Sequence, residues 1–223
     1  MQSVRVWDLP TRVFHWLLAT SVVGLVLSAK LGGDWMVWHL RLGYLVLTLL
    51  LFRLLWGFLG GHWSRFTRFA YGPGAVLNYL RGQAPLAHRV GHTPLGGLAV
   101  FALLTALALQ VGTGLISDDE IAFTGPLIRF VPPAWSAAAT HYHKAIGQFL
   151  VLGLVLLHLL AIGFYSGIKR EPLVGPMWHG DKALAEPVPT SLDGPRQRWR
   201  AVWLAALCAA VVYALVRLGQ GPA

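Results

Sequence analysis

Five long apolar stretches, separated by polar segments, dominate the sequence. They cover approximately residues 13–29, 36–60, 94–116, 141–168 and 199–217. Each is close to or above the roughly 18 apolar residues that cross a hydrocarbon core of about 30 Å. None alternates apolar and polar residues with the period of two that a membrane barrel requires. The pattern therefore predicts an all-α membrane helical bundle with a fifth, C-terminal transmembrane helix.

The composition agrees with a chain that lies in lipid. Hydrophobic residues make up 56% of the 223 residues and charged residues 12%, which leaves too little polar surface for a soluble globule. The first apolar stretch contains His15 and has no small-residue cleavage site after it, so we expect it to remain as a helix. The single cysteine, Cys208, excludes an internal disulfide and a thiolate metal cluster.

The net charge of +9 comes mainly from polar segments that alternate with the apolar stretches, which indicates membrane topology rather than a nucleic-acid-binding surface. Twelve basic residues fall in three segments on one side: Arg5, Arg12, Arg65, Arg68, Arg81, Arg89, Lys169, Arg170, Lys182, Arg196, Arg198 and Arg200. The positive-inside rule then predicts a cytoplasmic N-terminus. We expect membrane lipids as surroundings and no nucleic acid as partner. The 61–93 connection mixes aromatic and basic residues, which predicts a segment lying on lipid headgroups.

Four of the nine histidines lie within or at the edge of the apolar stretches: His15, His39, His143 and His158. Ionisable rings are costly in lipid and commonly functional there. His143 and His158 are fifteen residues apart, which leaves both near one face of a helix and on the order of 22 Å apart. This spacing suits two stacked cofactors better than one metal ion. His141 is the alternative to His143, but it faces about 100° away from His158.

Depth in the membrane sorts these histidines into two pairs. His15 and His158 lie toward the cytoplasmic side, and His39 and His143 lie toward the outside. Two neutral imidazoles fill both axial positions of a haem iron and suit it to one-electron exchange. The sequence therefore predicts two haem groups with these pairs as axial ligands. The alternative for each histidine is a ring that hydrogen-bonds to a neighbouring helix.

Two arginines lie near the candidate ligands. Arg41 follows His39 by two residues, and Arg53 lies within the second apolar stretch, where its charge reaches water with difficulty. We expect each to pair with a haem propionate, Arg41 on the outer side and Arg53 on the cytoplasmic side. Gln110 is expected to hydrogen-bond between helices, with a quinone site as the alternative. The histidines of the polar connections are expected to be solvated: His62, His88, His92 and His179.

Six stretches form a larger pattern. They are VWDLPTRVFHW (6–16), WHLRLGY (38–44), FRLLWG (52–57), GHTPLGG (91–97), QVGTGL (110–115) and the fourth-stretch histidines followed by KRE (169–171). Together they resemble the prokaryotic cytochrome b561 family, which includes the b-type subunits of nickel-iron hydrogenases. The resemblance implies a four-helix dihaem core, two haem b groups, and ligand roles for His15, His39, His143 and His158.

Two features depart from that family pattern. The two fourth-span histidines are fourteen residues apart in the family and fifteen here, so the choice between His141 and His143 stays open. The fifth apolar stretch lies outside the pattern. We therefore expect residues 1–182 to form a cytochrome b561-like transmembrane haem-binding domain. Residues 183–223 would form a cytoplasmic linker and an extra transmembrane helix.

The resemblance implies electron transport in the inner membrane of a bacterium. Electrons would pass between the quinone pool of a respiratory chain and a periplasmic c-type cytochrome, dehydrogenase or hydrogenase subunit. An alternative is an enzyme, a superoxide oxidase that passes electrons from superoxide to quinone. It would need an outer cationic pocket, for which Arg41, Arg129 and Lys144 are the local charges. A third possibility, a haem-free proton transporter, lacks an Asp or Glu within an apolar stretch.

Overall fold

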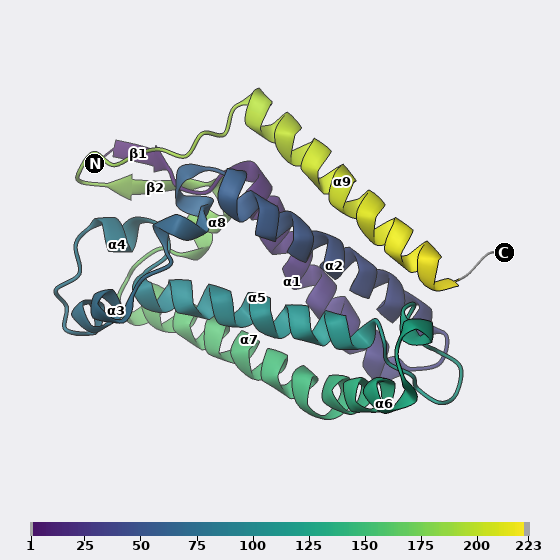
Figure 1. Cartoon of the computed structure of the whole chain (residues 1–223). Helices are drawn as coiled ribbons and strands as arrows, with labels where there is room; N and C mark the ends of the chain where they lie inside the picture. The colour runs from purple at the N-terminus through teal and green to yellow at the C-terminus, as the bar shows by residue number, and fades with distance from the viewer. Residues whose placement is uncertain (1, 221–223) are drawn as a thin grey trace. The chain divides into compact units, whose positions relative to one another are not determined.

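The computed structural model describes residues 2–220 and is built mainly of long helices (Figure 1). Five helical segments are long and apolar enough to cross a membrane: Leu9–Leu31 (α1), Trp35–Leu59 (α2), Pro94–Gly114 (α5), Pro133–Ile168 and Pro195–Gly219, which lies in α9 (Pro195–Gln220). They coincide with the five predicted apolar stretches. The all-α membrane-bundle prediction is therefore confirmed.

The turn between α1 and α2 follows directly from its glycines. Gly32 and Gly33 have φ angles of +66° and +53°, in the left-handed region that glycine enters without steric cost. Helix α1 therefore ends at Leu31, and α2 begins at Trp35. The short turn keeps the C-terminal end of α1 next to the N-terminal end of α2.

The fourth spanning segment is not a regular α-helix throughout. It consists of α6 (Pro133–His141), the π-helix η4 (Tyr142–Gly147), α7 (Gln148–Gly163) and the π-helix η5 (Phe164–Ile168). A π-helical turn closes its hydrogen bonds from i to i+5 and so accommodates one more residue than an α-helical turn. The segment η4 contains His143, so this wider turn accounts for the fifteen-residue spacing to His158.

The chain packs as two compact units. Unit 1 consists of the segment ending at His15 together with Arg53–Ala102 and Leu154–Val202. Unit 2 consists of Trp16–Phe52, Leu103–Gly153 and the segment that begins at Trp203. The long helices contribute to both units. The short elements of unit 1 are η1 (His62–Ser64), η2 (Phe66–Arg68), α3 (Pro73–Leu80), α4 (Ala87–Val90) and α8 (Val174–His179), and unit 2 contains η3 (Ile128–Phe130).

Unit 1 also contains a two-stranded antiparallel ribbon that the apolar pattern does not predict. Strand β1 (Gln2–Arg5) pairs with β2 (Asp181–Leu184), with Gln2 opposite Leu184 and Arg5 opposite Asp181 (Figure 1). The Arg5 guanidinium also donates to Asp193, at 2.7 Å. The ribbon thus ties the start of the chain to the segment between α8 and α9.

The 61–93 connection packs into unit 1. Trp63 is 6% exposed, Phe66 9% and Phe69 2%. The expectation that this connection lies on headgroups is therefore wrong for these three side chains, which protein covers instead. Helix α3 differs, because Leu77 and Leu80 are exposed.

Gly180 joins α8 to the ribbon and offers a test of this packing. Its φ is +98°, its carbonyl accepts hydrogen bonds from Val6 and Trp7, and a Cβ there would lie 2.8 Å from the Trp7 carbonyl oxygen. Gly180→Ala is expected to lower the free energy of unfolding by about 1–3 kcal/mol. Thermal unfolding in detergent measures the loss. Gly72→Ala is the control, because a Cβ there meets no described atom within 4 Å; equal midpoints for the two variants would contradict the prediction.

Candidate cofactor site

The structure brings the four membrane histidines together as two pairs, one in each unit. In unit 1 the ring centroids of His15 (α1) and His158 (α7) are 6.4 Å apart. In unit 2 those of His39 (α2) and His143 (η4) are 6.0 Å apart. These are the pairs that membrane depth predicts. His141 is exposed at the end of α6, whereas His143 is partly buried.

The separation within each pair is the separation of two imidazoles that share one metal ion. An imidazole nitrogen binds a transition metal at about 2.0–2.1 Å, so two rings on opposite sides of one ion have centroids roughly 6 Å apart. Within residues 2–220, no three His, Cys, Asp or Glu side chains gather as a metal site. A two-ligand site fits a metal that carries its own equatorial ligands, as the iron of a porphyrin does.

Backbone carbonyls fix the tautomers of the unit 2 pair. The Nδ1 of His39 lies 3.0 Å from the Leu25 carbonyl oxygen, and the Nδ1 of His143 lies 2.8 Å from that of Gln110. A carbonyl oxygen only accepts hydrogen bonds, so Nδ1 is the protonated nitrogen in both rings. The Nε2 lone pair of each is thereby kept for a metal, which is how metal-binding imidazoles are commonly oriented.

Helix α5 is shaped to receive His143. A Cβ on Gly114 would lie 2.9 Å from the His143 Cε1, so glycine lets the ring approach the helix. Gln110 donates from Nε2 to the His143 carbonyl oxygen at 3.0 Å, which confirms its expected interhelical hydrogen bond. On α2, Gly43 is one turn after His39 on the same face, and a Cβ there would meet no described atom within 4 Å. A flat macrocycle thus has room beside His39.

The two predicted arginines differ in burial. Arg53 is 3% exposed; it donates to the Ser64 carbonyl oxygen at 2.9 Å, and its Cζ lies 4.8 Å from the Phe66 ring centroid. Arg41 is exposed and lies over the Trp38 ring at 5.0 Å. Both propionate pairings therefore remain predictions.

Asp8 forms a buried network in unit 1 that its place in a polar segment of the sequence does not reveal. Its side chain is fully buried. Its oxygens accept from four donors: Thr11 N at 2.8 Å, Trp56 Nε1 at 3.1 Å, Gly61 N at 3.0 Å and Ser64 Oγ at 2.7 Å. The Thr11 bond makes Asp8 the cap of α1, which begins at Leu9. The others tie the start of α1 to the end of α2 and to η1.

His92 is a second feature that the sequence does not reveal; it is partly buried, and its Nδ1 atom is shielded from solvent. Its ring centroid is 4.2 Å from that of Phe69 and 4.7 Å from that of Trp7. Burial, and then the charges of Arg53 and of the two unit 1 ligand candidates, lower its pKa. The expectation of a solvated loop histidine is therefore wrong here, because the connection folds inward. The sequence places His92 two residues before the start of α5 at Pro94, but its aromatic neighbours come from distant segments.

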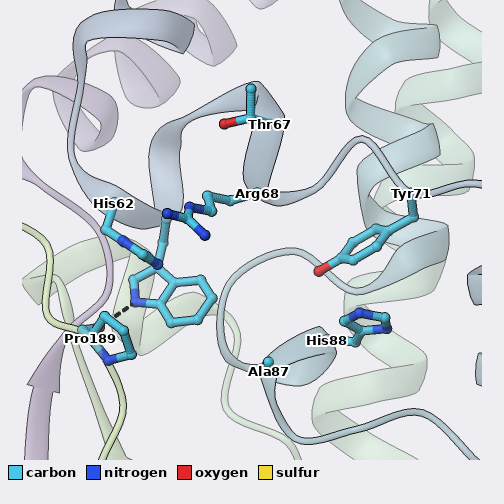
Figure 2. Close-up of a pocket in the computed structure, with 8 residues that line it drawn as sticks. His62, Thr67, Arg68, Tyr71, Ala87, His88 and Pro189 are labelled. Atoms are coloured by element: carbon cyan, nitrogen blue, oxygen red, sulfur yellow. Dashed lines mark hydrogen bonds between the residues drawn. The ribbon is translucent and has the colours of Figure 1, made fainter.

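Unit 1 also contains a surface pocket of about 390 Å³, lined mainly by residues of the 61–93 connection (Figure 2). On one side Trp63 donates from Nε1 to the Pro189 carbonyl oxygen at 2.7 Å. On the other, the rings of Tyr71 and His88 face each other, with centroids 4.5 Å apart. None of the four paired histidines lines this pocket. It is therefore separate from the candidate cofactor site.

Together these features define a class of protein: a multi-pass helical membrane protein with an imidazole pair inside each unit. Comparison with known families agrees. Residues 6–180 match the family described as prokaryotic cytochrome b561. The chain belongs to the prokaryotic cytochrome b561 family, and membership implies haem b as its cofactor.

Two relatives cover most of the chain. Both are described as a probable Ni/Fe-hydrogenase B-type cytochrome subunit. The protein of Bradyrhizobium diazoefficiens is 24% identical over 214 residues, covering 81% of this chain and 86% of the relative. The protein of Rhizobium leguminosarum bv. viciae is 24% identical over 215 residues, covering 81% and 89%. The chain also matches a GPI mannosyltransferase 3 of Yarrowia lipolytica, with 31% identity over 110 residues. That match covers 47% of this chain and 21% of the mannosyltransferase, so no functional argument rests on it. No solved structure matches the chain.

Proposed function

We propose that the chain binds two haem b groups, one at each histidine pair, and carries single electrons between a periplasmic redox partner and the quinone pool. His15 and His158 would be the axial ligands of one haem, and His39 and His143 those of the other. The haems would supply iron that changes oxidation state by one electron. The two imidazoles of each pair would hold the iron and so keep dioxygen from binding to it.

The observation that carries the proposal is the separation of the paired rings. Centroids 6.4 Å and 6.0 Å apart leave space for one metal ion between the imidazoles of each pair. The hydrogen-bonded Nδ1 atoms of His39 and His143 support it further, because they keep Nε2 for a metal. Rings that only hydrogen-bond to neighbouring helices would have no reason to adopt this spacing twice.

Topology and partner are part of the same proposal. We propose a cytoplasmic N-terminus in the inner membrane of a bacterium, because the positive-inside rule favours that side for the basic segments. The named relatives favour a hydrogenase subunit as the redox partner, with a c-type cytochrome or a dehydrogenase as other candidates. We also propose that the family-like domain ends near residue 182, since the family match ends at 180. Residues 183–223 then form a linker and an added helix.

Quinol reduction of the purified protein tests the electron-transfer role. Ubiquinol or menaquinol added in stopped flow should reduce the haems of the wild-type chain, and the b-type absorbance of the reduced form should appear. Haems that dithionite reduces but that both quinols leave oxidised would contradict a quinone-linked carrier. Superoxide in the presence of quinone tests the enzyme alternative, for which Arg41, Arg129 and Lys144 provide exposed positive charges in unit 2.

Replacing Arg53 with leucine is expected to lower the midpoint potential of the haem at His15 and His158. Loss of a buried positive charge near the haem makes its iron harder to reduce. We expect about a tenfold change in the reduction equilibrium, which is 59 mV for one electron. Spectroelectrochemical titration measures it. Arg53→Lys keeps the charge and should shift the potential less; an unchanged potential in Arg53→Leu contradicts the propionate pairing.

A further inference from the structure

The imidazole of His92 is held in place by aromatic side chains of unit 1. It contacts Phe69 in a tilted arrangement and Trp7 edge-on, with ring planes at 47° and 61°. The Tyr71 hydroxyl donates to the His92 carbonyl oxygen at 3.2 Å, which fixes the backbone as well. His92 is therefore positioned by neighbours from two separate segments of the unit, the start of the chain and residues 69–71.

The Nδ1 atom of His92 is an orphaned polar group. It is shielded from solvent and has no hydrogen-bond partner among the residues that the structure describes. An unpaired buried nitrogen costs free energy, because its hydration is lost without replacement. Folded proteins satisfy nearly all such atoms, and the exceptions commonly mark a bound group or ion.

A buried positive charge, that of Arg53, lies near the ring of His92. The guanidinium of Arg53 lies over two aromatic rings, 4.8 Å from the centroid of Phe66 and 5.9 Å from that of Phe69, and Phe69 is the ring that His92 contacts. The groups whose charges act on His92 are Arg53, His15 and His158, in that order. His92 therefore lies close to both Arg53 and the unit 1 histidine pair. An anion between Arg53 and His92 would satisfy both.

We propose that His92 donates a hydrogen bond from Nδ1 to a propionate carboxylate of the haem at His15 and His158, beside Arg53. This inference rests on the proposed function, because it requires a haem at that pair. A neutral imidazole has one N–H, and hydrogen bonds to a carboxylate are stronger than those between neutral groups. The lowered pKa of His92 keeps the ring neutral at pH 7 and leaves it this single donor. His92 is a positioning residue that orients the haem and not an iron ligand.

The test is His92→Phe, which keeps a flat ring against Phe69 and Trp7 but removes the donor. We expect two haems per chain and a shifted propionate bending band in resonance Raman spectra. We also expect the reduction equilibrium of the unit 1 haem to fall by about threefold to tenfold, where tenfold is 59 mV for one electron. The potential of the unit 2 haem should not change. His92→Gln restores an N–H donor and should return the band and the potential toward wild type.

His88→Phe is the matched control. His88 also packs on an aromatic ring and has a shielded Nδ1, but it lines the surface pocket instead. This variant should leave the band and both potentials unchanged. If His92→Phe alters neither, the inference is overturned while the proposed function stands. Loss of the haem in both His92→Phe and His92→Gln also overturns the inference. The imidazole would then be required for folding and not as a hydrogen-bond donor. A wild-type chain without haem removes the proposed function itself.

Discussion

Replacing His143 with alanine is expected to remove one of the two haems and leave about half of the reducible b-type absorbance. The haem at His39 and His143 would be held by one imidazole instead of two, and the Gln110 carbonyl loses the ring that it orients. His39→Ala should give the same result, and the double variant should lose no further haem. His15→Ala and His158→Ala should each remove the other haem. Pyridine extraction with protein quantification gives haem per chain.

The matched control for this series is His141→Ala. His141 is two residues from His143 on the same helical segment, but it is exposed and lies outside both pairs. It should keep both haems. Loss of a haem in His141→Ala with retention in His143→Ala would assign the ligand to His141 and contradict the pairing. Retention of both haems in the His39→Ala, His143→Ala double variant would contradict a haem at this pair.

Asp8→Ala is expected to cause the largest loss of stability among the variants outside the histidine pairs. The substitution removes the carboxylate that accepts from four donors, among them the indole N–H of Trp56 and the backbone N–H of Gly61. Each stranded donor is costly, and removing one partner from a buried charged network commonly costs about 3–5 kcal/mol. Thermal unfolding in detergent should show a lower midpoint by a corresponding amount.

Two further variants make the Asp8 result interpretable. Asp8→Asn keeps one acceptor oxygen and should lose less stability than Asp8→Ala. Asp34→Ala removes an exposed carboxylate from the turn between α1 and α2 and should change the midpoint little. Equal midpoints for Asp8→Ala and Asp34→Ala would show that the buried network contributes nothing to stability.

The apolar pattern predicts the five spanning helices because lipid admits few alternatives for a backbone that must satisfy its own hydrogen bonds. It does not predict the β1–β2 ribbon, because the pairing of Gln2 with Leu184 joins distant short segments with no strand-like alternation. The π-helical turn of η4 is also hidden, since no local sequence rule requires it. Only the fifteen-residue spacing of His143 and His158 points to it.

The candidate site is predictable where burial alone gives the signal. A histidine in an apolar stretch is conspicuous, and helix direction sorts four of them into the pairs that the structure brings together. Asp8 and His92 lie in polar segments, where solvation is the ordinary expectation. Their burial depends on how the 61–93 connection folds onto the ends of α1 and α2, which is a tertiary property. Long-range packing of this kind leaves little trace in composition or periodicity.

The number of haems bound per chain tests the central claim most directly. The full-length protein, purified from cells supplied with iron and a haem precursor, is analysed by pyridine extraction against protein concentration from amino-acid analysis. Two imidazole pairs predict two haem b per chain, both reduced by dithionite. A single haem would contradict the assignment of one haem to each pair, and a colourless protein would contradict haem ligation altogether.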